Sequence, residues 1–453
     1  MRLEGRIATG MDEFMLRLGH LKVLLDILAT GSGNRQRLAR RLAEDLTQLV
    51  PVSPGQLQDV GRYLAEKELS HVSSPDGTSK PPHPKARYKH LRVHLGSDGS
   101  IERVVDNHSG GPVRIWFQDL AIADNRTRSK VGAVTTDREQ LTNKSGVSHL
   151  IDWAVILGAA NKRLGLTAVG RTLRSLCEKL GAEEALRGTT NPYIIGAERV
   201  VFLWLLAQVD GDVLVRLLPA LAGREEIVKG EAMEMMLSLA AAIQDDLNKN
   251  KNGTSSTALR ALRSLKEDLG ILLPSQRARR SKPSSTVWHR ISSRLEALTD
   301  VGLLEKTDTK GIRRHFEYYY RPTAALRVAC DSLEGATSLH DWAANHIVDF
   351  TATSLDVQLL NEGCEAELFD AALLTTGQTG IHIDSFAIAA ATLALARGKR
   401  LTIGRARQAL EDLATRRPEI ARLSRGYVGS GAEFASVIVS KLESLGPAAF
   451  GSN

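Results

Sequence analysis

The sequence predicts a mainly α-helical, multi-domain protein with short β-hairpins between its helices. Only 5% of its 453 residues are aromatic, while Ala, Leu and Arg abound, and this composition favours helices over long strands. In most segments the apolar residues recur at steps of three and four, the period of one helix face, whereas alternating stretches are few and short. The length is enough for about two to four domains.

The first domain is expected at residues 1–120, where helical spacing precedes alternating strands. The expected helices cover residues 12–28, 34–49 and 54–68, and the expected strands cover 91–95, 101–105 and 113–117. Basic side chains gather on the second helix and in the loop before the strands, and we expect DNA contact by Arg37, Arg41, Lys85, Arg87 and Lys89. The alternative is a small helical bundle whose basic loop is merely solvated.

A polar linker or surface loop at residues 121–147 leads to a helical middle domain at residues 148–247. Its helices are expected at residues 148–157, 167–180, 196–207, 212–221 and 228–246. The triplet Asp210–Gly211–Asp212 is interpreted as a loop leading into a helix, because a calcium-binding EF-hand would need more ligands at fixed offsets. The polar stretch 248–256 ends the domain.

The fourth segment, residues 257–330, joins an amphipathic helix to a basic hairpin. Gly302 is expected to end that helix, and strands are expected at residues 303–307 and 312–320 around a turn at 309–311. The apolar stripe of the helix contains Val287, Trp288, Ile291, Leu295 and Leu298, and the opposite face carries His289, Arg290, Ser293 and Arg294.

Residues 275–323 resemble the recognition helix and wing of the winged-helix superfamily, notably in the stretch LEALTDVGLLEK. The resemblance implies that the helix enters a DNA groove and that the hairpin meets phosphates. The implied groove residues are Thr286, His289, Arg290, Ser293 and Arg294, and the implied phosphate contacts are Lys310, Arg313 and Arg314. Further DNA contacts are expected from the basic cluster before the helix: Arg277, Arg279, Arg280 and Lys282. The alternative is a winged helix that binds protein.

The last domain, residues 338–447, shows a similar order of elements. A strand is expected at residues 381–383, and helices at 385–397 and 402–415, with Thr402 as the N-cap of the second. The core face of that second helix is expected to consist of Ile403, Ala406, Leu410 and Leu413. On its polar side Arg405 is expected to contact DNA, unless the arginines there are merely solvated or pair with Glu411 and Asp412. Winged-helix modules would then flank the helical middle domain.

The sequence lacks the common motifs of enzymes and cofactor sites. No glycine-rich loop is followed by the Lys that would reach a nucleotide phosphate, and no zinc-protease, deaminase or hydrolase motif occurs. His382 and Asp384 share one face of an expected strand, but a strand that ends at a capped helix gives the same pattern. Cys177, Cys330 and Cys364 do not have the spacing of a disulfide framework or a zinc site. We therefore expect no catalysis, no cofactor and no metal.

Net charge favours an acidic partner, since the chain carries +7 with a pI near 9.3. No leader or bilayer-spanning segment is evident, so we expect a cytoplasmic, nucleoid-associated protein with no membrane partner. These observations predict a non-catalytic double-stranded DNA-binding protein, the recognition subunit of a bacterial multi-protein DNA-processing or antiviral defence system, with other protein subunits as partners. The alternatives are a stand-alone transcription regulator and a structural adaptor that binds proteins such as a chromosome-organising motor.

Overall fold

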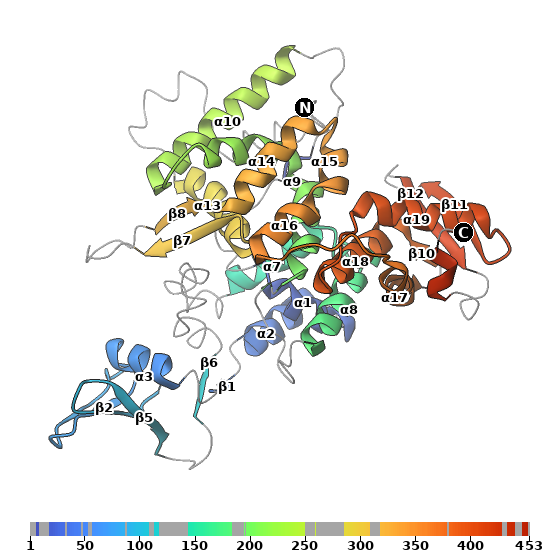
Figure 1. Cartoon of the computed structure of the whole chain (residues 1–453). Coiled ribbons are helices and arrows are strands. Elements are labelled where there is room, and N and C mark those ends of the chain that lie inside the picture. The colour runs from blue at the N-terminus through green and yellow to red at the C-terminus, as the bar shows by residue number, and fades with distance from the viewer. Residues whose placement is uncertain are drawn as a thin grey trace.

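The computed structural model is mainly helical, with short strands in small sheets (Figure 1). It describes residues 6–8, 18–31, 34–46, 49–52, 57–86, 88–107, 113–116, 144–183, 194, 196–249, 259, 285–308, 318–377, 380–427, 433–439 and 446–451. This composition of elements agrees with the mainly helical class predicted from the sequence. Within these ranges, no helix is both long enough and apolar enough to cross a membrane.

A long buried helix, α9 (Glu198–Ala222), lies at the centre of the helical body. Buried apolar residues occupy all of its sides, as expected for a helix surrounded by protein. Helices from distant parts of the chain pack around it: α8 (Ala168–Glu183), α10 (Lys229–Lys249), α14 (Ala324–Gly335), α15 (Leu339–Asn345), α16 (Ile347–Leu355) and α18 (Ile383–Ala396). Parts of three segments that the sequence analysis treated separately therefore pack on one helix.

The middle of α9 differs from the sequence-based expectation of two helices joined by a loop at residues 210–212. The helix continues through this point, and only Asp210 leaves helical backbone angles, with φ −129° and ψ 18°. Glycine at the next position permits the close packing of α15: a Cβ on Gly211 would lie 2.4 Å from Leu339 Cδ2, so the Leu339 side chain would have to shift. The acidic triplet is thus a kink inside a buried helix.

Arg294 of α13 (Ser285–Asp300) meets this kink in a buried ion pair. Its Nε donates to Asp210 Oδ2 at 2.6 Å and its Nη2 donates to Asp210 Oδ1 at 2.9 Å, and both side chains are at most 1% exposed. Ala8 completes the arrangement, because its N–H donates to Asp210 and its carbonyl accepts from Arg294. The pair therefore joins the N-terminal segment, the kink of α9 and α13.

The end of α13 and the hairpin after it confirm two predictions. Gly302 has a φ of +80°, and the N–H of Leu303 donates back to the carbonyl of Leu298, which is the usual glycine ending of a helix. Strand β7 (Leu304–Asp308) then pairs antiparallel with β8 (Tyr318–Pro322). The turn between them lies outside the described residues.

Buried charge fastens this hairpin to α13. Lys306 of β7 is 1% exposed and pairs with the carboxylate of Glu296, which also accepts a hydrogen bond from the Tyr320 hydroxyl at 2.6 Å. The backbone of Tyr320 also bridges to Ile227, directly before α10. Because α10 packs against α13 as well, the hairpin is built into the helical body.

The three N-terminal helices do not form the single unit that was expected. Helices α1 (His20–Ala29) and α2 (Arg35–Leu46) pack on each other and on α7 (Lys144–Ile156). A buried ion pair ties α1 to the start of α9, since Lys22 Nζ donates to the two carboxylate oxygens of Glu198 at 3.0 and 2.8 Å. The third helix belongs to a different part of the structure.

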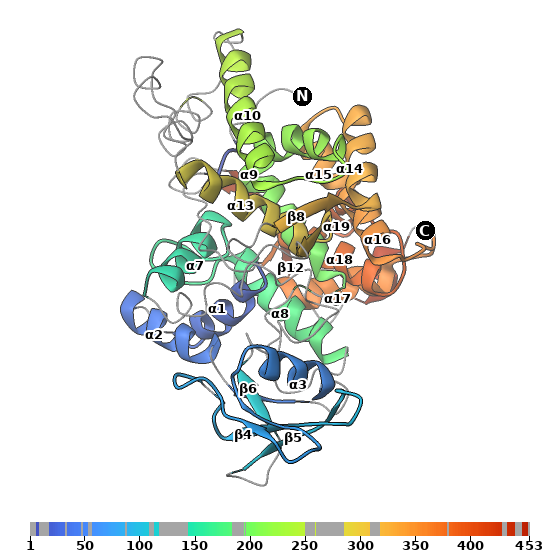
Figure 2. The ribbon, with the colours of Figure 1, turned by 90° about the vertical axis from the view of Figure 1, so that its left-hand side faces the viewer.

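That helix, α3 (Leu57–Glu66), covers a four-stranded sheet, and the two form a small lobe beside the helical body (Figure 1, Figure 2). Its strands lie in the order β3-β2-β4-β5. Gly61 permits close packing, because a Cβ there would lie 2.5 Å from Ile101 Cγ2. The strands of the lobe are β2 (His71–Ser73), β3 (Ser79–Lys80), β4 (Leu91–Leu95) and β5 (Ile101–Asp106), and a separate ladder pairs β1 (Leu49–Pro51) with β6 (Arg114–Trp116).

The C-terminal unit combines three helices with a second four-stranded sheet, ordered β11-β12-β10-β9. Helix α18 packs between α17 and α19, and α19 also packs on β11. The helices that the sequence predicts at 385–397 and 402–415 are confirmed, as is the Thr402 cap, which accepts a hydrogen bond from Arg405 N at 3.2 Å. The elements not yet given are α17 (Glu365–Thr375), β9 (Thr376–Gly377), β10 (Gly380–His382), α19 (Ile403–Arg416), β11 (Ala421–Tyr427) and β12 (Glu433–Val439).

Replacement of Arg294 by Met tests the importance of the buried pair. The apolar stem stays, but Asp210 is left as an unpaired buried charge, so we expect the free energy of unfolding to fall by about 3–5 kcal/mol. Urea denaturation followed by circular dichroism measures the loss.

The exposed pair between Arg400 and Asp349 supplies the control, since the Arg400 side chain is 47% exposed. The change Arg400→Met should cost about 1 kcal/mol or less. Equal losses for the two variants would contradict the special role of Asp210.

Candidate nucleic-acid interface

Much of the expected recognition helix and wing lies outside the described residues. For Thr286, His289 and Arg290 the backbone belongs to α13, but their side chains are outside the described set. The expectation of DNA contact by these residues stays a prediction. The candidate residues that are themselves outside the described ranges are Arg87, Arg277, Arg279, Arg280, Lys282, Lys310, Arg313 and Arg314.

Two of the expected groove residues, Ser293 and Arg294, are buried. Each is 1% exposed, and all residues from 291 to 300 are buried as well. Neither side chain can reach a DNA groove in this fold, which corrects the expectation. Helical spacing identified Arg294 as lying on a polar face, but it could not show that Asp210 lies against that face.

The N-terminal candidates are exposed but belong to different parts of the molecule. Arg37 and Arg41 lie on α2, in the helical body, where Arg41 Nη1 donates to Thr30 Oγ1 at 2.9 Å. Lys85 and Lys89 lie in the lobe that contains α3. The sequence predicts one winged-helix-like domain at residues 1–120, but these four cations do not lie on one element.

Helix α19 has the two-faced pattern that the sequence predicts. Its buried face consists of Ile403, Ala406, Leu410 and Leu413, together with Ala414. The exposed face carries Arg405, Gln408, Asp412, Thr415 and Arg416. Gln408 donates to Asp412 at 2.7 Å, one helical turn away, which orders the middle of this polar face.

Carboxylates neutralise the arginines around the start of α19. Arg400 donates to both oxygens of Asp349, at 2.9 and 2.7 Å. Arg407 lies 3.3 Å from Asp384 and 3.5 Å from Glu411. The alternative interpretation of solvated or paired arginines is therefore correct for Arg407 with Glu411.

Other arginines of the unit keep their charge exposed. Arg405 on the first turn of α19 and Arg422 and Arg425 on β11 have no carboxylate partner among the described residues. Arg416 donates to the carbonyl of Gly451 at 2.9 Å, a neutral group that leaves the arginine charge in place. We call Arg405, Arg416, Arg422 and Arg425 the basic surface; all four are exposed on α19 and β11, and strand alternation places Arg422 and Arg425 on opposite faces of β11.

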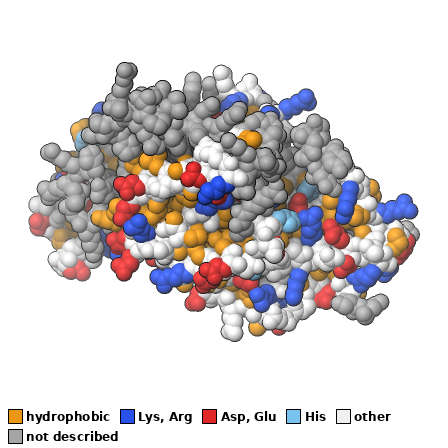
Figure 3. All heavy atoms as spheres, turned by 90° about the horizontal axis from the view of Figure 1, so that it is seen from above, with side chains coloured by type: hydrophobic (Ala, Val, Ile, Leu, Met, Phe, Trp, Pro, Cys, Tyr) orange, Lys and Arg blue, Asp and Glu red, His pale blue; other side chains and the backbone are white. Residues whose placement is uncertain are grey.

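The two strand arginines of the basic surface were missed in the sequence. They lie on β11, which extends to Tyr427, and the spacing of basic residues in ARLSRGY was the available signal. Seen from above, basic side chains are exposed at the end of the molecule where the C-terminal unit lies (Figure 3).

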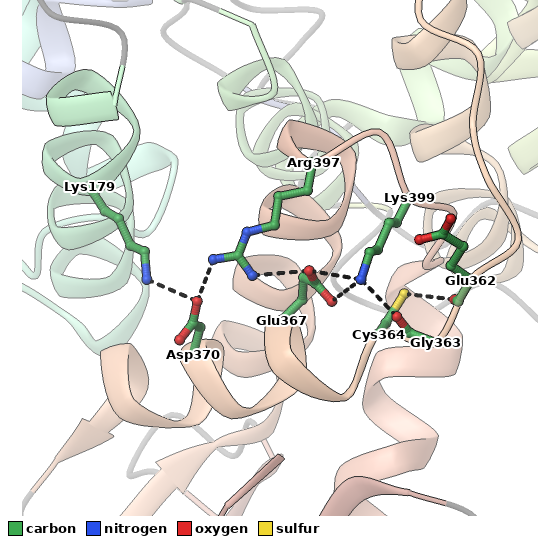
Figure 4. Close-up of polar contacts among 8 residues, drawn as sticks. All are labelled: Lys179, Glu362, Gly363, Cys364, Glu367, Asp370, Arg397 and Lys399. Carbon is green, nitrogen blue, oxygen red and sulfur yellow. Dashed lines mark hydrogen bonds and ion pairs between the residues drawn. The ribbon is translucent and has the colours of Figure 1, made fainter. Parts of the chain in front are cut away.

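An ion network fixes the base of the C-terminal unit to α8 (Figure 4). Arg397 donates to Glu367 at 3.0 Å and to Asp370 at 2.6 Å. Asp370 also accepts from Lys179 of α8 at 3.1 Å, and Lys399 Nζ lies 3.3 Å from Glu367. The network links α8, α17 and the end of α18, and α19 packs on α18.

These contacts lower the pKa values of Glu367 and Asp370. Burial by itself raises the pKa of Glu367, but hydrogen bonds from Arg397 and Lys399 outweigh burial, and the pKa lies below the ordinary value of 4.5. Burial and the bonds from Arg397 and Lys179 oppose each other in the same way at Asp370, where the net effect lowers the pKa from 3.8. Both acids are therefore ionised near neutral pH.

His382 caps the N-terminus of α18. Its Nδ1 accepts a hydrogen bond from the N–H of Ser385 at 3.4 Å and so caps the helix. Burial lowers the pKa of His382 below 6.5, with Asp384 opposing and Arg407 reinforcing the shift, which keeps the ring neutral for capping. Asp384 pairs with Arg407. His382 and Asp384, which the sequence places on one face of a strand, therefore both make structural contacts within the C-terminal unit.

The described residues offer little for covalent or metal chemistry. Within the described part of the chain, no group of three or more His, Cys, Asp or Glu could hold a metal ion. Burial is the main cause that raises the pKa of the thiols of Cys177 and Cys364, and it raises that of Cys330 to about 11. These thiols stay protonated at neutral pH and are weak nucleophiles.

No family model, curated protein or solved structure matches this chain.

Acidification tests the network at the base of the unit. A carboxylate whose pKa is lowered by folding stabilises the fold above its unfolded pKa, and this contribution is lost as the pH falls through the folded value. We therefore expect Glu367→Gln to lower the free energy of unfolding by about 1–3 kcal/mol at neutral pH. The gap to the wild type should close as the pH falls below 4.5, as thermal melts at several pH values would show.

The exposed Glu362, in the loop before α17, is a matched control. Glu362→Gln removes the same charge and should leave the melting temperature unchanged. A pH-independent deficit in Glu367→Gln would mean that packing, not ionisation, accounts for the loss.

Proposed function

We propose that the chain binds double-stranded DNA through the C-terminal unit, with α19 as the helix that approaches a groove. The observation that carries this proposal is the basic surface. Its arginines have no carboxylate partner among the described residues, while Arg400 and Arg407 nearby do. Lone exposed guanidinium groups are suited to phosphate, whose oxygens accept their hydrogen bonds.

The order of elements supports the same proposal. Three helices, α17, α18 and α19, precede the β11–β12 hairpin, and β12 lies between β11 and β10 in the sheet. At residues 275–323 the sequence predicts one helix followed by such a hairpin. In such an arrangement the last helix lies beside the wing, and both can meet one duplex.

The side chains on α19 have the chemistry that base and phosphate contacts require. Arg405 can donate to guanine or phosphate, and Gln408 can pair with adenine. Arg416, Arg422 and Arg425 would supply phosphate contacts, whose counterion release gives a steep dependence on salt.

Two exposed apolar side chains on the hairpin favour a second candidate, a protein-binding adaptor. Leu423 is 42% exposed and Ile438 is 50% exposed. Exposed apolar residues near a basic rim also occur at protein interfaces. The candidates differ in salt-sensitive DNA binding, which an adaptor would lack.

Fluorescence anisotropy with random duplex DNA tests the proposal. The triple change Arg405→Gln, Arg422→Gln and Arg425→Gln should weaken binding at least about tenfold at low salt and lower the slope of log K against log salt by about 2.7, because each lost phosphate contact contributes about 0.9.

The control removes three exposed cations elsewhere, through Lys162→Gln, Arg163→Gln and Arg327→Gln. This variant has the same net charge and should bind like the wild type. Equal losses of DNA affinity in both variants would mean that the effect comes from overall charge. Absence of DNA binding by the wild type would favour the protein-binding adaptor.

A further inference from the structure

The sheet of the small lobe has one face covered by α3 and an opposite face that carries polar side chains. Helix α3 packs on the first, where Leu91, Val93, Ile101 and Val104 are buried. Side chains alternate between the two faces along each strand. The residues between these apolar positions therefore belong to the opposite face.

The strand register brings five polar residues together on that opposite face. His71 pairs with Arg92, and Ser73 pairs with His94, across the parallel β2–β4 ladder. Arg103 of β5 pairs with His94 from the other side. We call His71, Ser73, Arg92, His94 and Arg103 the sheet face.

The described part of the sheet face carries no carboxylate. Asp106 pairs with Leu91 and so belongs to the side covered by α3. Glu102 lies at the irregularity after His94, and its charge opposes the lowering of the pKa of this histidine. Two arginines and two histidines thus share a surface with a single acid at its margin.

Two donors on the sheet face have no hydrogen-bond partner among the described residues. They are Arg92 Nε and Ser73 Oγ, both buried atoms. Buried polar groups are almost always satisfied, so an unsatisfied pair in neighbouring strands needs an explanation. An oxyanion seated between β2 and β4 would satisfy both donors and neutralise the arginine.

His94, one of the two histidines on this face, is favoured in its neutral form. Burial lowers the pKa of His94 below 6.5, and the charges of Arg103 and Arg92 lower it further, against the opposing effect of Glu102. A bound anion would reverse the effect of the arginines and favour the protonated ring. Anion binding here is therefore coupled to proton uptake by His94.

We propose that the sheet face binds the phosphate backbone of a nucleic acid strand. Its basic residues extend over three strands, which is about 10 Å at the usual strand spacing. A row of that length can engage more than one phosphate, as a polynucleotide offers and a single phosphate does not. The proposal adds a second contact to the proposed DNA-binding function and rests on it for the class of ligand.

The test measures binding of labelled duplex and of labelled single-stranded oligonucleotide to the full chain, at about pH 8 and about pH 5.5, values on either side of the histidine range. Wild-type affinity should rise at least about threefold on acidification, because the protonated His94 adds a positive charge near the phosphate. His71→Gln with His94→Gln should keep the affinity seen at pH 8 and lose the increase, because both histidines lie on the sheet face. Arg92→Gln with Arg103→Gln should weaken binding about tenfold at both pH values.

Three further measurements make the result decisive. The change Lys162→Gln with Arg163→Gln removes the same charge elsewhere and should leave binding intact, while Arg103→Gln alone, at an exposed position, separates lost binding from lost folding. Unchanged binding in the sheet-face variants, or an acid response that persists in His71→Gln with His94→Gln, overturns the proposal. Displacement of oligonucleotide by an equal concentration of inorganic pyrophosphate would also overturn it, in favour of a small phosphate ligand.

The variants of the two surfaces distinguish this proposal from the proposed function. If the C-terminal triple variant binds normally and the sheet-face variant does not, the sheet face stands and the role of α19 fails. The reverse outcome removes the sheet face alone.

Discussion

The ion pair between Arg294 and Asp210 determines how the body of this protein is assembled. It is bidentate, both partners are at most 1% exposed, and Ala8 supplies the remaining backbone contacts. Without it, a kinked acidic turn would lie unpaired at the centre of α9, and a buried lone charge costs several kcal/mol. The N-terminal segment, α9 and α13 are therefore held in one arrangement that other packings of the same apolar faces would not satisfy.

The same logic recurs along α9, which receives a polar partner from a different element at each of its charged residues. Glu198 pairs with Lys22 of α1, and Arg199 donates to the carbonyl of Ser354 at the end of α16. Apolar packing is non-directional, whereas these contacts each fix one orientation. We infer that the charges of α9 give the helical body its register and that its apolar residues supply most of its stability.

The C-terminal unit separates its charges into an inner and an outer set. The inner arginines and lysines meet Glu367, Asp370 and Asp384 and fix the helices to one another. The outer arginines of the basic surface meet no such acid among the described residues. This division lets one unit be both rigidly anchored and available to an anionic partner, which is what the proposed DNA contact requires.

The sequence by itself determined the helical class, most helices, the Gly302 ending, the Thr402 cap and the buried stripe of α19, because these depend on local periodicity and local backbone preference. It also placed Arg405 on the polar side of that helix, where the structure shows it exposed. Only the tertiary structure showed that Arg294 pairs with Asp210 in the core, that His71 lies beside Arg92 in the sheet, and that α3 packs apart from α1. Each of these depends on residues that are distant in the chain. Polarity can be read locally, but whether a polar side chain meets water, a ligand or a buried partner depends on what the rest of the chain packs against it.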